Sequence, residues 1–367
     1  MTPAPTICTV VTKSYLGYAR ALDLLFRRHH PGGRCVVLVS DEPDGCYDPK
    51  AEAFEIVSMK DLAVSDPDCM RFQYTAFELC NALKPFLLLH ILKRTNIDRV
   101  FYLDADMGVM APLGELFREL DEASVLLTPH TSVPFPEDGC WPDANAISKA
   151  GTYNAGVVGV RNSPEGIRFL EWWRDRLITG CIDDPDNGFY VDQKYLEEVP
   201  GKFAGVRVLQ HDGVNVAHFN LHSRTLAGGP ENRTCNGHPL LLFHFTQANY
   251  GTGDFWPPVS RPLVKQQPLL KELIRSYGRI LEDCHVATTR KWPYTWGHFP
   301  DGTPISGDIR RQLLKECTPS GRAADANPFL DPSWLARQKR HRMQDKSAAP
   351  LLLFARAAGW LRRRFGK

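Results

Sequence analysis

Apolar and polar positions follow two different periods in the first part of the chain. Ile7–Val11 is a short apolar run rich in β-branched residues, which favours a strand. From Tyr15 to His29 apolar residues recur at helical spacing along one face, and Cys35–Ser40 is a second apolar run. The pattern predicts a strand, a helix and a strand, and therefore a parallel sheet in an α/β fold.

The pattern continues beyond this unit. A helical pattern spans about Phe72 to Lys93, and Val100–Leu103 is an apolar strand that ends abruptly in acidic residues. Further strands are predicted at Ser124–Leu127, Asn154–Val160, Val206–Leu209 and Leu240–Thr246. Ser163-Pro164-Glu165 is typical of a helix start and predicts a helix through Arg176. From about Thr288 onward proline and glycine interrupt the pattern, so an irregular extension is expected.

Composition narrows the class of protein. The 367 residues are 43% hydrophobic and 23% charged, which is typical of a folded globular protein and excludes disordered and collagen-like chains. Ten cysteines form no C-x-x-C pair, so reduced thiols in a reducing compartment are expected. Met1–Val11 lacks the features of a signal peptide. The longest apolar stretches, such as Pro85–Leu92, are shorter than the roughly 20 residues that cross a bilayer. We expect a cytoplasmic protein.

Charge is distributed unevenly along the chain. The net charge of +2 divides into about −7 for residues 1–336 and +9 for residues 337–367, where ten Lys and Arg accompany one acid, Asp345. Residues 350–365 place apolar side chains on one helical face, so the tail fits an anionic membrane surface. A helix docked on the protein itself and a solvated tail are the alternatives. Nucleic acid is not expected as a partner, because no nucleic-acid-binding module accompanies the charge.

Two acids follow the strand at 100–103. In Asp104-Ala105-Asp106 alternate residues of an extended segment face the same way, so both carboxylates can converge on one hard divalent cation. His244 lies in the apolar run Leu241–Thr246 and is either a satisfied core residue or a third ligand. An imidazole added to two carboxylates suits manganese better than calcium or magnesium.

Four other polar residues allow two interpretations each. Asn154 either forms a turn before a buried strand or offers its amide to sugar hydroxyls. Asp192 is either a helix cap or, together with Gln193, a pair that holds a sugar and faces its anomeric carbon. Lys84 is either an ordinary surface lysine or a residue that reaches a phosphate.

The order of these motifs resembles the GT-A nucleotide-sugar glycosyltransferases. The resemblance is strongest to the retaining family 8 type, which includes glycogenin and bacterial lipopolysaccharide galactosyltransferases. Six elements match in the family's order over about 240 residues: Thr9–Tyr15, Ala82–Pro85, Tyr102–Asp106, Tyr153–Val157, Val191–Gln193 and Phe243–Phe245.

This resemblance implies a domain organisation. It predicts a single Rossmann-like GT-A domain over residues 1–285, with a central mixed and mostly parallel sheet. An irregular, partly helical extension over 286–332 would pack on that domain, and residues 333–367 would form the basic amphipathic tail.

The resemblance also implies residue roles. Asp104, Asp106 and His244 would bind Mn²⁺ (or Mg²⁺), which would hold the donor diphosphate. The nucleotide would contact Thr12, Lys13, Tyr15 and Asp104, and the donor sugar would contact Lys84, Asn154 and Asp192. Gln193, with Asp192 beside it, would be the catalytic residue on the β-face of an α-linked donor.

The expected function is transfer of a sugar, most simply from a UDP-sugar, to a glycan or lipid-linked glycan with retention of configuration. An amide is a poor covalent nucleophile, so we expect front-face substitution. The chain departs from the family after Phe245, where Thr246–Gly251 replaces a Gly and Lys-Pro-Trp-like segment that clamps the diphosphate. Three alternatives remain: inverting transfer with Asp143 or Asp184 as base, a haloacid-dehalogenase-like phosphohydrolase, and an inactive sugar-binding module.

Overall fold

The computed structural model describes residues 4–94, 97–256, 261, 267–316 and 327–340. Its contacts group the chain into two compact units. The first contains Met1–Ser65 and Ala76–Thr295, and the second contains Asp66–Thr75 and Trp296–Lys367. The three-part division expected from the sequence stays a prediction, because most of the basic tail lies outside the described residues.

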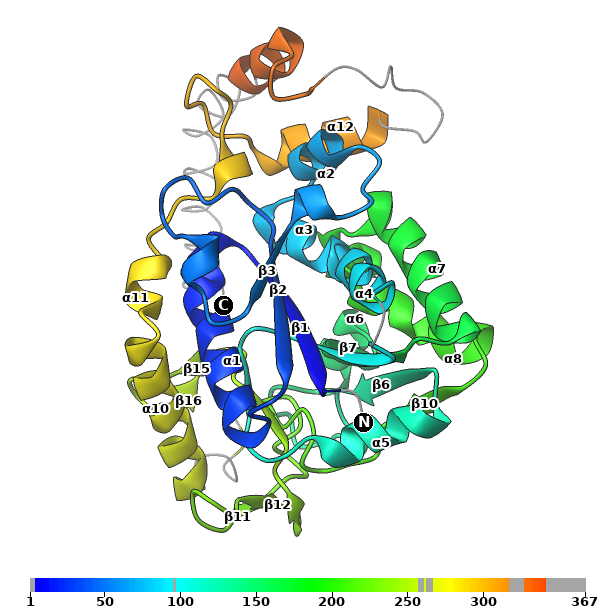
Figure 1. Ribbon diagram of the computed structural model, residues 1–367, viewed down its shortest axis with the longest axis vertical. Coiled ribbons are helices and arrows are strands. Elements are labelled where there is room, and N and C mark those ends of the chain that lie inside the picture. The colour runs from blue at the N-terminus through cyan, green and yellow to red at the C-terminus, as the bar shows by residue number, and fades with distance from the viewer. Residues whose placement is uncertain (1–3, 95–96, 257–260, 262–266, 317–326, 341–367) are drawn as a thin grey trace, which may run out of the picture. The chain divides into compact units, whose positions relative to one another are not determined.

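A seven-stranded sheet forms the centre of the first unit (Figure 1). Its spatial order is β10 (Val206–Val208), β6 (Val125–Pro129), β7 (Tyr153–Arg161), β4 (Arg99–Leu103), β1 (Thr6–Val11), β2 (Arg34–Val39) and β3 (Glu55–Ser58). In this sheet β7 runs antiparallel to β4 and β6, and the other neighbours pair in parallel. The expected α/β class with a mixed, mostly parallel sheet is confirmed.

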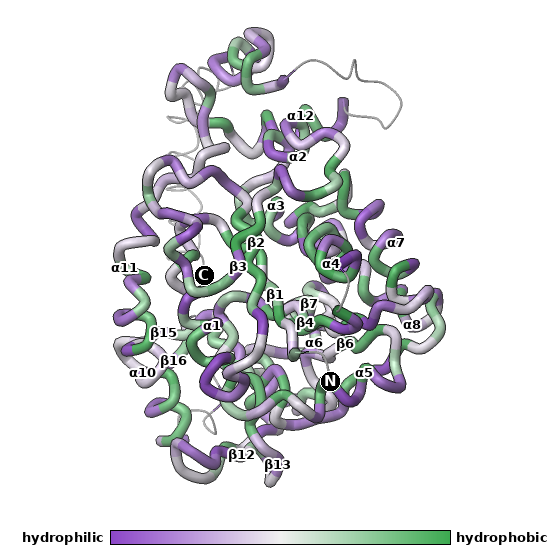
Figure 2. Tube along the Cα trace, in the orientation of Figure 1, coloured by the Kyte–Doolittle hydropathy of each residue, from purple (hydrophilic) through white to green (hydrophobic). Residues whose placement is uncertain are grey.

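Helices cover both faces of this sheet (Figure 1). One face packs against α1 (Leu16–His29) and α5 (Gly114–Glu122), and α10 (Pro268–Asp283) packs against α1. The other is covered by α3 (Ala76–Ala82), α4 (Lys84–Leu92) and α7 (Pro164–Gly180). Strands buried on both faces are apolar throughout rather than alternating, and Figure 2 shows the central strands as hydrophobic. This explains why β1 and β2 could be read from the sequence as continuous apolar runs.

The helical pattern expected from Phe72 to Lys93 is divided in the structure. Its first residues end α2 (Pro67–Gln73), which belongs to the second unit, and the remainder forms α3 and α4. Pro85 lies in the first turn of α4, where a missing N–H costs no helical hydrogen bond. The helix start at Ser163 is confirmed, because the Ser163 side chain accepts a hydrogen bond of 3.1 Å from the Gly166 amide.

The second unit has its own apolar cluster. Within the extension expected to be irregular and partly helical, α12 (Gly307–Glu316) is a helix that buries Ile309, Arg310 and Leu313. Residues 332–340 are also helical. The ring of Phe72 lies 5.7 Å from Phe299 and 5.8 Å from that of Trp334. Nearby proline and glycine residues interrupt the helical pattern around α12, so its bounds were not predicted from the sequence.

Two further expectations concern the whole chain. The nine cysteines in the described part of the chain are thiols rather than members of disulfides. Among the described helices, none is both long enough and apolar enough to cross a bilayer. The amphipathic helix expected over 350–365 lies outside the described residues.

Candidate metal centre and active site

Strand pairing brings Asp104, Asp106 and His244 together from distant parts of the chain. Asp104 follows β4, and its amide donates to the Gly156 carbonyl of β7 at 2.9 Å. The chain then enters β5 (Met107–Val109), which pairs antiparallel with β14 (Leu242–His244) so that His244 lies opposite Met107. The Phe245 amide donates to the Asp106 carbonyl at 2.9 Å. This register fixes the histidine beside the acidic pair.

The three side chains form a compact cluster. His244 Nε2 lies 3.2 Å from Asp106 Oδ1 and 3.9 Å from Asp104 Oδ2, and one ligand atom from each residue lies within 4.8 Å of the others. The side chains of Asp104 and Asp106 are 29% and 27% exposed, whereas that of His244 is 5% exposed. A buried imidazole therefore anchors a site that is open to solvent on its carboxylate side.

The charges of the cluster favour a cation. Burial opposes ionisation of Asp104, but Lys84 and His244 outweigh burial and lower the pKa of Asp104. Burial likewise opposes the imidazolium form of His244, yet Asp106 and Asp104 raise the pKa of His244. Two carboxylate oxygens and one imidazole nitrogen are a donor set that fits a divalent ion such as Mn²⁺ or Mg²⁺.

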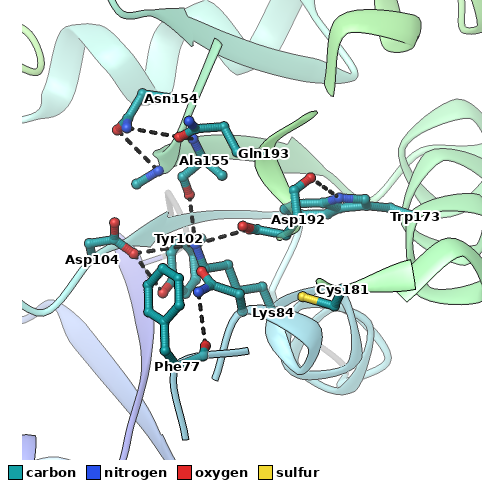
Figure 3. Close-up of polar contacts among 12 residues, drawn as sticks. Phe77, Lys84, Tyr102, Asp104, Asn154, Ala155, Trp173, Cys181, Asp192 and Gln193 are labelled. Atoms are coloured by element: carbon teal, nitrogen blue, oxygen red, sulfur yellow. Dashed lines mark hydrogen bonds and ion pairs between the residues drawn. The ribbon is translucent and has the colours of Figure 1, made fainter. Parts of the chain in front are cut away.

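Lys84 is buried beside the cluster, so its interpretation as a surface lysine is wrong. Its ammonium lies 3.0 Å from Asp192 Oδ2 and 3.4 Å from Asp104 Oδ1, and it donates to the Ala155 carbonyl at 3.3 Å (Figure 3). It also stands 4.6 Å from the centre of the Tyr102 ring. The Tyr102 hydroxyl in turn donates to Asp104 Oδ1 at 2.9 Å.

The buried ion pair changes the pKa of both partners. Burial opposes the charged form of Lys84, but Asp104 and Asp192 outweigh it and raise the pKa of Lys84. Burial raises the pKa of Asp192 to about 6, although Lys84 counteracts part of this rise. The Asp192 side chain is only 1% exposed and makes no helix-cap hydrogen bond. The cap interpretation of Asp192 is therefore wrong.

Gln193 and Asn154 form an amide network next to this pair (Figure 3). Gln193 Oε1 accepts hydrogen bonds of 3.0 Å from Asn154 Nδ2 and from the Ala155 amide. Its Nε2 donates to the Ala150 carbonyl at 2.9 Å. Both acceptor positions of the Gln193 oxygen are thus used by the protein. The network joins β7 to the short helix η5 (Gln193–Glu198).

The residues expected at the nucleotide follow β1, whose carboxyl end lies beside that of β4. Lys13 is fully buried, and its ammonium contacts Asp41 at 3.2 Å, Asp44 at 2.7 Å and the Thr295 hydroxyl at 2.7 Å. Its charge is therefore already balanced by the protein's own carboxylates.

Thr12 and Tyr15 differ in accessibility. The Thr12 hydroxyl shares a 2.8 Å hydrogen bond with Ser14, and Thr12 is buried. Tyr15 is 40% exposed and stacks on Tyr18 with ring centres 5.2 Å apart. Of the four residues expected at the nucleotide, Thr12 and Lys13 are buried, Asp104 belongs to the cluster described above, and Tyr15 is the most exposed.

Sequence reasoning missed two residues that shape the cluster. A Cβ atom at Gly156 would lie 2.6 Å from Asp104 Oδ2 and 3.1 Å from His244 Cε1, so only glycine fits there without displacing a ligand. Asn215 Oδ1 lies 3.1 Å from His244 Nδ1. The available signal was weak, because Asn215 stands between two valines, Val214 and Val216, with no motif that marks it as part of a site.

Comparison with known proteins gives distant similarities. No family model matches the chain. It is 26% identical over 243 residues to the uncharacterized protein YfnF of Bacillus subtilis (strain 168), an alignment that covers 65% of this chain and 80% of that protein. It is 27% identical over 188 residues to the uncharacterized protein YfnD of the same organism, covering 50% of this chain and 58% of that protein.

Similar solved structures are glycosyltransferases. The galactosyltransferase LgtC in complex with donor and acceptor sugar analogs has a TM-score of 0.43 at 13% identity, covering 76% of this chain and 95% of that one. The glycosyltransferase GlyE of Streptococcus pneumoniae TIGR4 has a TM-score of 0.43 at 17% identity, covering 81% and 67%. At these TM-scores the likeness establishes neither the reaction nor the substrate of this chain.

Gly156→Ala is expected to weaken divalent-metal binding by about tenfold or more, the usual cost of disturbing the shell that orients metal ligands. The added methyl group would displace Asp104 or His244. Calorimetric titration with Mn²⁺ measures the change. Gly32→Ala is the matched control, since nothing lies within 4 Å of a Cβ there. Equal Mn²⁺ affinity of the wild type and Gly156→Ala would contradict the geometry described.

Lys84→Met is expected to lower the free energy of unfolding by about 3 kcal/mol at pH 8, the typical cost of leaving one buried charge unpaired. The loss should be smaller at pH 5. Without the ammonium, the pKa of Asp192 rises further above about 6. At a pH below this pKa Asp192 is neutral and its burial costs little, whereas at a pH above it the buried carboxylate is charged and destabilises the folded state. Urea denaturation at both pH values measures this.

The double variant Lys84→Met/Asp192→Asn is the control for that experiment. It removes the titrating carboxylate, so its loss of stability should be similar at pH 5 and pH 8. A loss in Lys84→Met that does not change with pH would show that the ion pair is not the source of the destabilisation.

Proposed function

We propose that the protein is a metal-dependent glycosyltransferase that moves a sugar from a nucleoside-diphosphate sugar, such as a UDP-sugar, to a glycan acceptor. The observation that carries the proposal is the Asp104, Asp106 and His244 cluster at the carboxyl edge of β4. Ligands of open α/β sheets bind at that edge. A cluster of two partly exposed carboxylates and one buried imidazole is suited to a metal that also contacts a diphosphate.

The surrounding residues supply the other requirements. Bound Mn²⁺ or Mg²⁺ would neutralise the charge that develops on the β-phosphate of the departing nucleoside diphosphate. Lys84 holds Asp104 and Asp192 in place through buried ion pairs, which are stronger than they would be in bulk solvent. Tyr15 is 40% exposed, with Tyr18 stacked on its ring and the Arg290 guanidinium 4.5 Å from the ring centre, and would contact the nucleotide through the part of the side chain that faces solvent.

Residues at the sugar position favour retention of configuration. Asp192 and Asn154 would provide a carboxylate and an amide for sugar hydroxyls, and Gln193 holds the Asn154 amide in place. The Gln193 amide is a weak nucleophile, and its oxygen already accepts two hydrogen bonds. A covalent intermediate on it is therefore disfavoured.

Front-face substitution remains as the route. The acceptor oxygen forms a bond to the anomeric carbon while the bond from that carbon to the phosphate oxygen breaks. The acceptor proton passes to the departing phosphate oxygen. No protein carboxylate is needed as a base in this reaction.

The rival functions have less support from the site. Asp143, one proposed base for inverting transfer, caps α6 (Ala144–Ala150) by accepting a 2.8 Å hydrogen bond from the Ala146 amide. Asp184, the other, accepts a 2.8 Å hydrogen bond from the Asn187 side chain. A phosphohydrolase of the haloacid-dehalogenase type would carry its acidic pair after the first strand, whereas this pair follows β4.

A lipid-linked acceptor and contact with an anionic membrane surface are part of the proposal on the basis of sequence. They depend on residues 337–367, of which 341–367 lie outside the described residues. The positive charge of this segment would draw the protein to anionic headgroups, and a membrane-bound acceptor would then be within reach.

The direct test is a panel of UDP-, GDP-, CMP- and dTDP-sugars incubated with Mn²⁺, with released nucleotide as the readout. One donor should be turned over by the wild type, and turnover should fall to background in Asp106→Ala and on removal of metal by a chelator. Asp143→Ser keeps a helix-capping side chain but removes the carboxylate, so it should retain activity if transfer is retaining.

Two results would count against the proposal. Folded protein that neither binds nor turns over any donor in the panel would favour a binding module or a hydrolase. Loss of activity in Asp143→Ser, with metal binding intact, would favour inverting transfer with Asp143 as the base.

A further inference from the structure

Asn215 is a buried residue that contacts the cluster from behind. It is fully buried, and its Oδ1 lies 3.1 Å from His244 Nδ1. On the other side of the same ring, His244 Nε2 lies 3.2 Å from Asp106 Oδ1. The imidazole is thus held between an amide at one nitrogen and the carboxylates at the other.

Whether Nε2 of His244 can bind metal depends on which of the two ring nitrogens carries the proton. A neutral imidazole has one N–H donor and one acceptor nitrogen, and a ligand nitrogen must offer its lone pair. When Nδ1–H donates to Asn215 Oδ1, the lone pair of Nε2 faces Asp104 and Asp106. If the amide were reversed, its NH₂ group would require Nδ1 as acceptor, and Nε2 would carry the proton instead.

The backbone around Asn215 is fixed against β14. The Asn215 carbonyl accepts a 2.9 Å hydrogen bond from Asn220 Nδ2. The next residue, Val216, accepts from the His244 amide at 2.8 Å and donates to the Leu242 carbonyl at 3.0 Å. The carbonyl of Val214 accepts a 2.7 Å hydrogen bond from Arg224. These bonds leave the Asn215 side chain little freedom to move away from His244.

The residue type at this position also points to its oxygen. Asn215 has a φ of 53°, a left-handed conformation in which Asn and Asp are enriched among non-glycine residues. Its Nδ2 has no partner among the described residues, and an unsatisfied buried donor costs about 1–3 kcal/mol. A glycine would adopt the same φ without that cost, so the amide is best explained by the acceptor that it provides.

We propose that Asn215 is a positioning residue for the metal centre, which holds His244 in the tautomer and orientation that present Nε2 to the cation. The inference rests on the proposed function only in requiring a divalent metal at Asp104, Asp106 and His244. Partners of this kind typically change metal affinity by about 10- to 100-fold when they are removed.

The test is calorimetric titration of Mn²⁺ into the full chain without nucleotide. Asn215→Gly removes the acceptor but accepts the left-handed backbone, and should weaken Mn²⁺ binding by about tenfold or more. Asn215→Asp keeps an acceptor oxygen at the same place and should bind within a few-fold of the wild type. Asn236→Gly is the matched control, because Asn236 also has a positive φ of 49° and does not contact the cluster.

A second measurement is made on the wild type and uses a variant only to assign the His244 signal. The wild type is labelled with ¹⁵N-histidine and loaded with diamagnetic Cd²⁺. The His244 ring signal is identified among those of the 12 histidines by its absence in His244→Gln. This signal should show a proton on Nδ1 and metal on Nε2. The opposite assignment would overturn the proposal, as would wild-type affinity in Asn215→Gly. If the wild type turns over a nucleotide-sugar but binds no metal at this cluster, the inference fails while glycosyl transfer stands.

Discussion

A buried ammonium with two carboxylates around it is the interaction on which the site depends. Lys84 contacts both Asp104 and Asp192, and it is almost completely removed from solvent. Burying one charge without a partner costs several kcal/mol, whereas a well-packed pair with further hydrogen bonds is tolerated. The Ala155 carbonyl and the Tyr102 ring complete the environment of the ammonium. As a result, α4, β4 and the segment before η5 are held together at the centre of the site.

The second constraint is topological. Immediately after Asp106 the chain enters β5, which pairs with β14. His244, from much later in the chain, therefore lies beside the acidic pair. Glycine at 156 leaves the space in which Asp104 and His244 approach each other. The ion pair on one side and the strand pairing on the other therefore hold the two carboxylates next to His244 while leaving them partly accessible to solvent. That is the arrangement which a metal and a diphosphate require.

Local patterns in the sequence were enough to predict six of the seven strands of the sheet and the acidic pair, but not the edge strand β3. Buried parallel strands are apolar along their whole length, and the break from Leu103 to Asp104 marks where β4 ends. Residues whose role depends on tertiary packing could not be predicted in the same way. Lys84 and Asp192 have the sequence context of a surface lysine and a helix cap, and only their approach in space shows that they form a pair.

The same limit explains the other differences. Lys13 follows a strand at the expected edge of the sheet, but Asp41 and Asp44 from the loop after β2 bind its ammonium. The role of Asn215 cannot be recognised from the sequence, because it depends on β14 placing His244 beside it.

The central claim, that Asp104, Asp106 and His244 form one metal centre, is tested most directly by anomalous diffraction from crystals soaked with Mn²⁺ and UDP. The account predicts a manganese peak between these three side chains, and a peak elsewhere with none at this cluster would contradict it.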